Sequence, residues 1–137
     1  MQYEELRKHG IVYLATPYSK YPAGIEAAFQ DAAALAGKLV RLKVNVYSPI
    51  AHTHPIAMHG GLDPLNIDLW LGFDAAMMDK ADALLVAQMD GWDSSTGIAH
   101  EMQVFKNAGK PIRFLDPVTM GVGHIAMIAP SAVAANG

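Results

Sequence analysis

The sequence predicts an α/β domain in which helices cover both faces of a mostly parallel β-sheet. Short apolar, β-prone runs alternate with longer segments of helical periodicity, which is typical of parallel sheets with crossover helices. The chain has 137 residues, the size of one domain. Hydrophobic residues make up 52% and charged residues 17%, a balance that favours a packed core over disorder. We therefore expect a single three-layer, doubly wound domain over residues 1–137.

The first half of the chain predicts two strands and one long helix. Residues 11–15, IVYLA, form an apolar run that Thr16-Pro17 ends. The alanine-rich segment 24–43 has apolar residues at helical spacing, so we expect a long helix there. Residues 44–50, VNVYSPI, predict a second strand. The segment 51–61, AHTHPIAMHGG, carries three histidines and closes on a glycine pair, and we interpret it as a loop.

The second half continues the alternation. Asp63-Pro64 has the pattern of an N-cap followed by proline at the first helical position, which predicts a helix over about residues 64–80. Residues 81–89, ADALLVAQM, suit a central parallel strand. A helix over about residues 96–108 and a strand over residues 110–116 follow. The tail from Pro117 has weak periodicity, and it either packs as a further short element or is partly ordered.

Composition and charge exclude several classes of partner. The formal net charge is −3 without a cluster of Lys or Arg, so we do not expect a nucleic acid polymer as the partner. Without cysteine, neither a disulfide framework nor a thiolate metal site can form. Residues 1–10 are charged and lack the apolar core of a signal peptide. No uncharged apolar run reaches the ~18 residues of a membrane span. We expect a cytoplasmic protein with a small-molecule partner and no membrane association.

Two carboxylates fall on the apolar faces of predicted helices. At about 100° per residue, Glu101 lies in one sector with Phe105 and Ala108. Asp74 lies in the middle of the sector that contains Trp70. A carboxylate on such a face is costly unless it is paired, and its pKa is usually shifted. Either each carboxylate caps a helix or pairs with a cation, or the two form a functional site; the Ser/Thr run between them favours the second.

The predicted positions assign different roles to the two carboxyl groups. In parallel sheets, ligands bind beyond the carboxyl ends of the strands. The loops of residues 15–24, 48–61 and 89–97 all follow predicted strands, so we expect them to lie on one rim. A carboxylate near a helix N-terminus is held ionised by the dipole, which suits Glu101 to act as a nucleophile or electrostatic stabiliser. Asp74, in an apolar setting, can keep a proton and act as an acid. Cleavage at an anomeric carbon uses this division of labour.

Three segments within residues 11–116 carry a resemblance to a known superfamily: IVYLATPYS, FDAAMMDKADALLV and GWDSSTGIAHEMQVFKNAGKPI. They resemble the nucleoside 2-deoxyribosyltransferases and the related 2′-deoxynucleoside 5′-phosphate N-hydrolases. The resemblance implies a flavodoxin- or Rossmann-like fold and an enzyme that cleaves or transfers the N-glycosidic bond of a nucleoside or nucleotide. It implies that Glu101 attacks C1′ and that Asp74, eight positions before Asp82, assists at the base. Neither a metal nor an organic cofactor is required.

The same resemblance implies substrate contacts and an assembly. Ser95, six positions before the glutamate, contacts the sugar or its phosphate, and we add the neighbouring Thr96. The first-loop aromatic of the family matches Tyr13 or Tyr18, and we prefer Tyr18. Members of the superfamily usually assemble as homodimers or larger oligomers, so we expect a dimer or tetramer. The apolar helical segment 65–78 is the candidate contact surface.

Three loop residues complete the set of candidate substrate contacts. Trp92 either stacks on a base or packs over the mouth of the site. Asp93 either orients Ser95 or begins the turn. His52 is a candidate contact for a sugar or phosphate, although loop histidines more commonly cap or hydrogen-bond.

Three other functions stay open at this point. A non-catalytic nucleotide sensor of the same fold would keep its ligand affinity when Glu101 is replaced by Gln. A phosphoribohydrolase shares the turn that leads to a glutamate, but its usual PGG sequence is absent. A metal-dependent phosphoesterase would use the loop of His52, His54 and His59, which matches no known metal-site spacing, so we assign no metal ligands.

Overall fold

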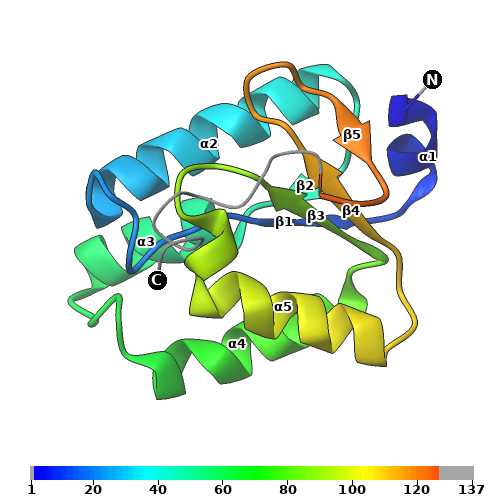
Figure 1. Cartoon of the computed structure of the whole chain (residues 1–137). Helices are drawn as coiled ribbons and strands as arrows, with labels where there is room; N and C mark the ends of the chain where they lie inside the picture. Colours follow the sequence, from blue (N-terminus) through cyan, green and yellow to red (C-terminus); the bar gives the residue numbers. More distant parts are fainter. Residues whose placement is uncertain (1, 127–137) are drawn as a thin grey trace.

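The computed structural model describes residues 2–126 of the chain and contains one five-stranded sheet. The strand order is β2-β1-β3-β4-β5, in which the first four strands are parallel and β5 is antiparallel to β4. This order, with helices on both faces, is that of the flavodoxin-like doubly wound folds and confirms the predicted α/β class (Figure 1). The strands are β1 (Val12–Ala15), β2 (Val46–Tyr47), β3 (Ala83–Ala87), β4 (Ile112–Leu115) and β5 (Val122–Gly123).

The helices form the outer layers of the domain. In Figure 1, α2 lies on one side of the sheet, and α4 and α5 lie on the other. None of the helices within residues 2–126 is long and apolar enough to cross a membrane. The helices are α1 (Gln2–Lys8), α2 (Ile25–Arg41), α3 (Pro49–Gly60), α4 (Ile67–Lys80) and α5 (Thr96–Asn107), with a short 3₁₀ turn, η1 (Trp92–Ser94).

Two hydrophobic clusters sandwich the sheet because successive side chains of a strand point to opposite faces. Val12 and Leu14 of β1 belong to the cluster on the side of α1 and α2. Tyr13 and Ala15, the residues between and after them, belong to the cluster on the side of α4 and α5. The second cluster includes the fully buried Phe105 of α5, and it forms the floor under the segment that carries Glu101.

Residues 49–60 form a helix, so the prediction of a loop there was wrong. The Ser48 hydroxyl accepts a hydrogen bond from the Ala51 N–H at 3.1 Å, and Pro49 occupies the start of α3. Gly61 adopts a left-handed conformation with φ of 68° and ends the helix. Because α3 begins at Pro49, β2 is limited to two residues.

The start of α4 also differs from the prediction. Asn66, not Asp63, is the N-cap, and its side chain accepts the Leu69 N–H at 3.3 Å. Asp63 instead accepts the N–H of Leu65 two residues later, which makes a turn before the helix.

Two elements lie in segments for which the sequence assigned no structure. The α1 helix, within the charged residues 1–10, is attached to β4 through Arg113, whose guanidinium donates two hydrogen bonds to Glu5 at 2.7 and 2.9 Å. Within the tail, β5 is a short edge strand. Residues 127–137, the rest of that tail, lie outside the described residues.

Candidate functional site

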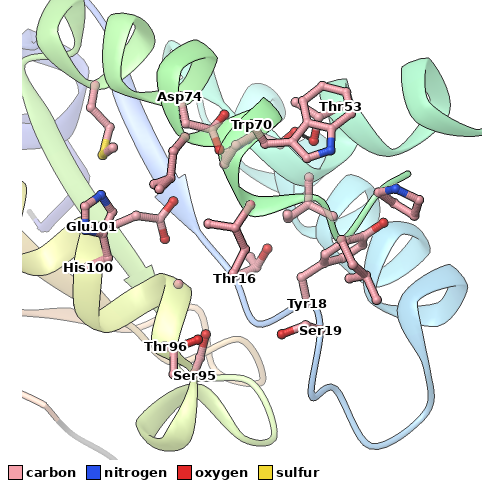
Figure 2. A pocket seen from close by; sticks show the side chains of 18 residues that line it. Thr16, Tyr18, Ser19, Thr53, Trp70, Asp74, Ser95, Thr96, His100 and Glu101 are labelled. Atoms are coloured by element: carbon pink, nitrogen blue, oxygen red, sulfur yellow. Dashed lines mark hydrogen bonds between the residues drawn. The ribbon is translucent and has the colours of Figure 1, made fainter. Parts of the chain in front are cut away.

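A cavity of about 400 Å³ opens beyond the carboxyl ends of β1, β2 and β3 (Figure 2). This is the edge of the sheet at which doubly wound folds bind their ligands. Segments that follow each of these strands line it, so the prediction that these loops meet at one rim is confirmed. The lining residues are Thr16, Tyr18, Ser19, Pro49, Ile50, Thr53, Pro64, Leu65, Ile67, Trp70, Leu71, Asp74, Met78, Ser95, Thr96, Gly97, His100 and Glu101.

One face of α4 supplies the wall that carries Asp74. The lining residues of α4 recur every three or four positions, the spacing of one helical face, and Asp74 stands among them as the sequence predicted. This face borders the cavity more than the core, since Ile67 is 67% exposed and Met78 is the buried residue of α4. Trp70, which shares the predicted apolar sector of Asp74, lines the cavity and donates its indole N–H to the Asp63 carbonyl at 2.9 Å.

The first two turns of α5 supply the opposite wall. Gly97, His100 and Glu101 line the cavity at helical spacing. Figure 2 shows the Glu101 and Asp74 side chains reaching from their two helices toward the same space. Within residues 2–126, neither carboxyl group forms an ion pair with Lys or Arg. A structural ion pair therefore does not explain why these two carboxylates face inward.

Buried polar atoms without partners cluster at this site. Thr16 Oγ1 and Asp74 Oδ1, both on residues that line the cavity, are buried and have no hydrogen-bond partner within the described part of the chain. Leaving such an atom unsatisfied costs roughly 1–3 kcal/mol. Two such atoms beside one cavity indicate a site that a polar ligand or water completes.

The surroundings of Glu101 favour its protonated form. Burial raises the pKa of the Glu101 carboxyl from 4.5 to about 8, with a further rise from the charge of Asp74. The nearby Tyr13 hydroxyl opposes this shift and lowers the pKa of Glu101, but burial is the larger effect. The expectation that the helix dipole keeps Glu101 ionised is therefore wrong, because burial raises the pKa of the carboxyl above neutral pH. Glu101 is the sixth residue of α5, and the dipole acts mainly within the first turn.

Asp74 titrates below Glu101. Burial raises the pKa of the Asp74 carboxyl from 3.8 to about 6. Because the two groups interact, the two titration steps belong to the pair. Between about pH 6 and pH 8, the pair therefore holds one proton, predominantly on Glu101. One carboxyl group that can donate a proton and one carboxylate thus coexist in the cavity at neutral pH.

The two candidate tyrosines occupy different positions. Tyr18 lines the cavity. Tyr13 is fully buried beside Tyr47 and Phe105, at ring-centroid distances of 5.6 and 5.7 Å, and its hydroxyl interacts with Glu101. The Tyr13 hydroxyl thus lowers the pKa of Glu101, and burial raises the pKa of Tyr13 itself.

Ser95 and Thr96 line the cavity where α5 begins. The Ser95 hydroxyl is the N-cap of α5 and accepts the Ile98 N–H at 3.2 Å. A capping hydroxyl can still donate its own proton to a ligand, so capping and substrate contact are compatible.

Replacing Ser95 with Ala should lower the free energy of unfolding by about 1 kcal/mol, because the N-cap of the helix that carries Glu101 is lost. Ser95→Thr should keep most of the stability, since threonine also caps. Urea denaturation measures the difference, with Ser94→Ala as the control, because Ser94 is exposed and does not cap α5. Equal losses for Ser94→Ala and Ser95→Ala would contradict the capping role.

The remaining candidates lie outside the cavity lining. Trp92 packs against Phe114 at a centroid distance of 6.0 Å and joins the cluster beneath α5. Asp93 lies with it in η1. His52 is exposed on α3 and hydrogen-bonds through Nδ1 to the Tyr47 hydroxyl at 3.1 Å. The structure therefore brings Glu101, Asp74, Tyr18, Ser95 and Thr96 together, but not these three residues.

Sequence reasoning missed one buried histidine next to the cavity. The His54 side chain is 3% exposed and connects two residues. Its Nδ1 is 2.6 Å from the Tyr18 hydroxyl, and its Nε2 is 2.8 Å from Glu26 Oε2. No group of three His, Asp or Glu side chains in residues 2–126 is arranged to hold a metal ion. The segment was predicted as a loop, and the apolar residues of α3 form no single stripe, so no periodic pattern marked His54 as buried.

A family model described as a domain of unknown function (DUF1937) matches residues 10–116. The matched region contains β1 to β4 and every lining residue of the cavity, and it leaves out α1 and β5. No curated protein matches the chain. The match names no activity, so the resemblance to nucleoside deoxyribosyltransferases stays a prediction.

Proposed function

The chain belongs to the DUF1937 family, and we propose that it is an enzyme that cleaves or transfers the N-glycosidic bond of a nucleoside or nucleotide. One observation supports this most strongly: two carboxyl groups face one cavity, with pKa values of about 6 and about 8 and no paired cation in the described residues. Chemistry at an anomeric carbon needs such a pair, one group as an acid and the other as an anion.

The proton held by the pair supplies both roles. Before the reaction the proton resides mainly on Glu101. Transfer of this proton to Asp74 leaves Glu101 as a carboxylate, which attacks C1′ as the C1′–N bond breaks. Asp74 then gives the proton to the departing base nitrogen. Water attacks the resulting glycosyl ester in a hydrolase, and a second base attacks it in a transferase.

The rest of the lining matches the two halves of such a substrate. Hydroxyl side chains of Thr16, Ser19, Thr53 and Thr96 can hydrogen-bond to a sugar. The apolar side chains of Ile50, Trp70 and Leu71 offer a surface for a flat base. A cavity of about 400 Å³ lies within the range of small-molecule sites.

We further propose a cytoplasmic homo-oligomer that uses neither a metal nor an organic cofactor. The apolar exposed side chains of α4 support a contact between copies: Ile67, Leu69, Leu71 and Phe73 are each at least 38% exposed. Gel filtration with light scattering should give the mass of a dimer or larger species. A monomer of 14.7 kDa at working concentration would remove this part of the proposal.

The direct test is incubation of the protein with ribo- and 2′-deoxyribonucleosides and their 5′-phosphates, with and without a free acceptor base. Chromatography should show release or exchange of a base with wild-type protein and with none of the substrates when Glu101→Ala is used. Substrate binding without base release by the wild-type protein would favour a sensor that keeps this fold and cavity.

A further inference from the structure

Three residues from three separate segments form a hydrogen-bonded chain that leads from the surface to the cavity. Glu26 lies in the first turn of α2, and its side chain is 67% exposed. His54 lies buried on α3, and Tyr18 follows β1 and lines the cavity. The Phe29 ring stacks on His54 at a centroid distance of 4.7 Å and an angle of 20°, which fixes the plane of the imidazole.

The chemistry of the chain sets its direction. An ionised carboxylate can only accept hydrogen bonds, so His54 Nε2 must carry a hydrogen and donate a hydrogen bond to Glu26. In the neutral ring, Nδ1 then has no proton and accepts the hydroxyl proton of Tyr18. Burial, with a smaller contribution from the charge of Glu26, raises the pKa of Tyr18 to about 12, so the phenol keeps its proton at neutral pH.

The oxygen of Tyr18 consequently has only lone pairs left for the cavity. We infer that Glu26, acting through His54, holds Tyr18 as a hydrogen-bond acceptor toward the substrate, and that the site therefore prefers an uncharged nucleoside to its 5′-phosphate. The 5′-hydroxyl of a nucleoside, placed against Tyr18, can donate to such an oxygen, whereas an ionised 5′-phosphate in the same place has no proton to offer. The cavity lining supports this preference, because among the described residues it contains two carboxyl groups, which repel a phosphate, and neither Lys nor Arg. Glu26 and His54 are positioning residues, and the substrate preference rests on the proposed function.

The direction of the chain can be measured without a substrate. A long-range ¹H–¹⁵N spectrum of histidine-labelled protein at pH 8.5, above the ordinary titration range of histidine, distinguishes the two neutral tautomers. We expect His54 to carry its proton on Nε2 in the wild type and to shift toward a mixture of tautomers in Glu26→Ala. Asp31→Ala is the control, because Asp31 is an exposed carboxylate of the same helix. It accepts a hydrogen bond from the Tyr21 hydroxyl, which is not part of the hydrogen-bonded chain of Glu26, His54 and Tyr18. A proton on Nδ1 in the wild type, or an unchanged spectrum in Glu26→Ala, would overturn the inference.

The preference for a nucleoside is measured with the substrate that base release identifies. Glu26→Ala and Tyr18→Phe should each lower the ratio of kcat/KM for the nucleoside to kcat/KM for its 5′-phosphate about tenfold, the value of one hydrogen bond, mainly through KM. The double variant should match Tyr18→Phe alone, because the residues act as a unit. Additive decreases of this ratio in the double variant, or an unchanged ratio in the single variants, would refute the role of the hydrogen-bonded chain. If no substrate releases its base, the proposed function fails while the tautomer spectrum still decides the direction of Tyr18.

Discussion

Replacing Glu101 with Gln should abolish base release and at the same time stabilise the protein at alkaline pH. Gln cannot attack C1′, so we expect kcat/KM to fall at least about 10³-fold, equal to roughly 4 kcal/mol of transition-state stabilisation. The side chain is of similar size and carries no charge, so the variant avoids the penalty of ionising a buried group. If Glu101 only stabilised the fold, Glu101→Gln would keep base release and lower the free energy of unfolding.

The pH dependence of stability follows from the raised pKa of Glu101. The group titrates at about 8 in the folded protein and ordinarily at 4.5, so its contribution to stability is fully present below 4.5. That contribution is lost as the pH rises to about 8. Each pKa unit corresponds to about 1.4 kcal/mol, so Glu101→Gln should gain at least about 2 kcal/mol over the wild type between pH 5 and pH 9.

Urea denaturation of both proteins at pH 5 and pH 9 measures this difference. Asp79→Asn is the matched control, because Asp79 is an exposed carboxylate on α4 and should change neither activity nor the pH dependence. Parallel stability profiles for wild type and Glu101→Gln would show that Glu101 is ionised or solvated in the folded protein, against the structure.

Replacing Asp74 with Asn should lower kcat about 10²-fold, within the range that general acid catalysis contributes. The loss should depend on the leaving group. A nucleoside whose purine is methylated at N7 carries a cationic base that leaves without protonation, so its cleavage should fall much less. Glu101→Gln should be inactive on both kinds of substrate, because the nucleophile is needed in each case.

The same variant should change the shape of the pH–rate profile. In the wild type, the pair with one proton is the active form, so activity should fall below about pH 6 and above about pH 8. Without the charge of Asp74, the pKa of Glu101 falls, and activity should rise with pH through that lower value and then stay level. A wild-type profile that is kept in Asp74→Asn, or equal losses on both kinds of substrate, would exclude Asp74 as the acid.

Local patterns predicted the sheet and the two carboxylates. The apolar runs that became β1 and β3 are fully buried and that of β4 is half buried, and the helical periodicity placed Asp74 and Glu101 on faces that line the cavity. Both kinds of pattern reflect burial on a regular backbone, so they can be read from spacing alone. The α3 helix was missed because it contains Pro55 and its apolar residues form no regular stripe, so only the Ser48 cap and the Gly61 stop mark it.

Other features depend on contacts between distant segments. The order of the two carboxyl pKa values depends on how deeply each group is buried, which the helical position of Glu101 does not determine. The Tyr18–His54–Glu26 chain joins residues 28 and 36 positions apart, and no local pattern connects them. Trp92 and His52 stand in segments next to the site, yet their side chains pack against Phe114 and Tyr47.

The carboxyl pair itself can be observed by ¹³C NMR of protein labelled at the side-chain carboxyl carbons of Asp and Glu. Across a titration from pH 4 to pH 10, the pair should show steps near pH 6 and near pH 8, the first largest at Asp74 and the second largest at Glu101, and the upper step should move down in Asp74→Asn. Steps near pH 4 for both groups, as for exposed carboxylates, would contradict the shared proton on which the proposed chemistry depends.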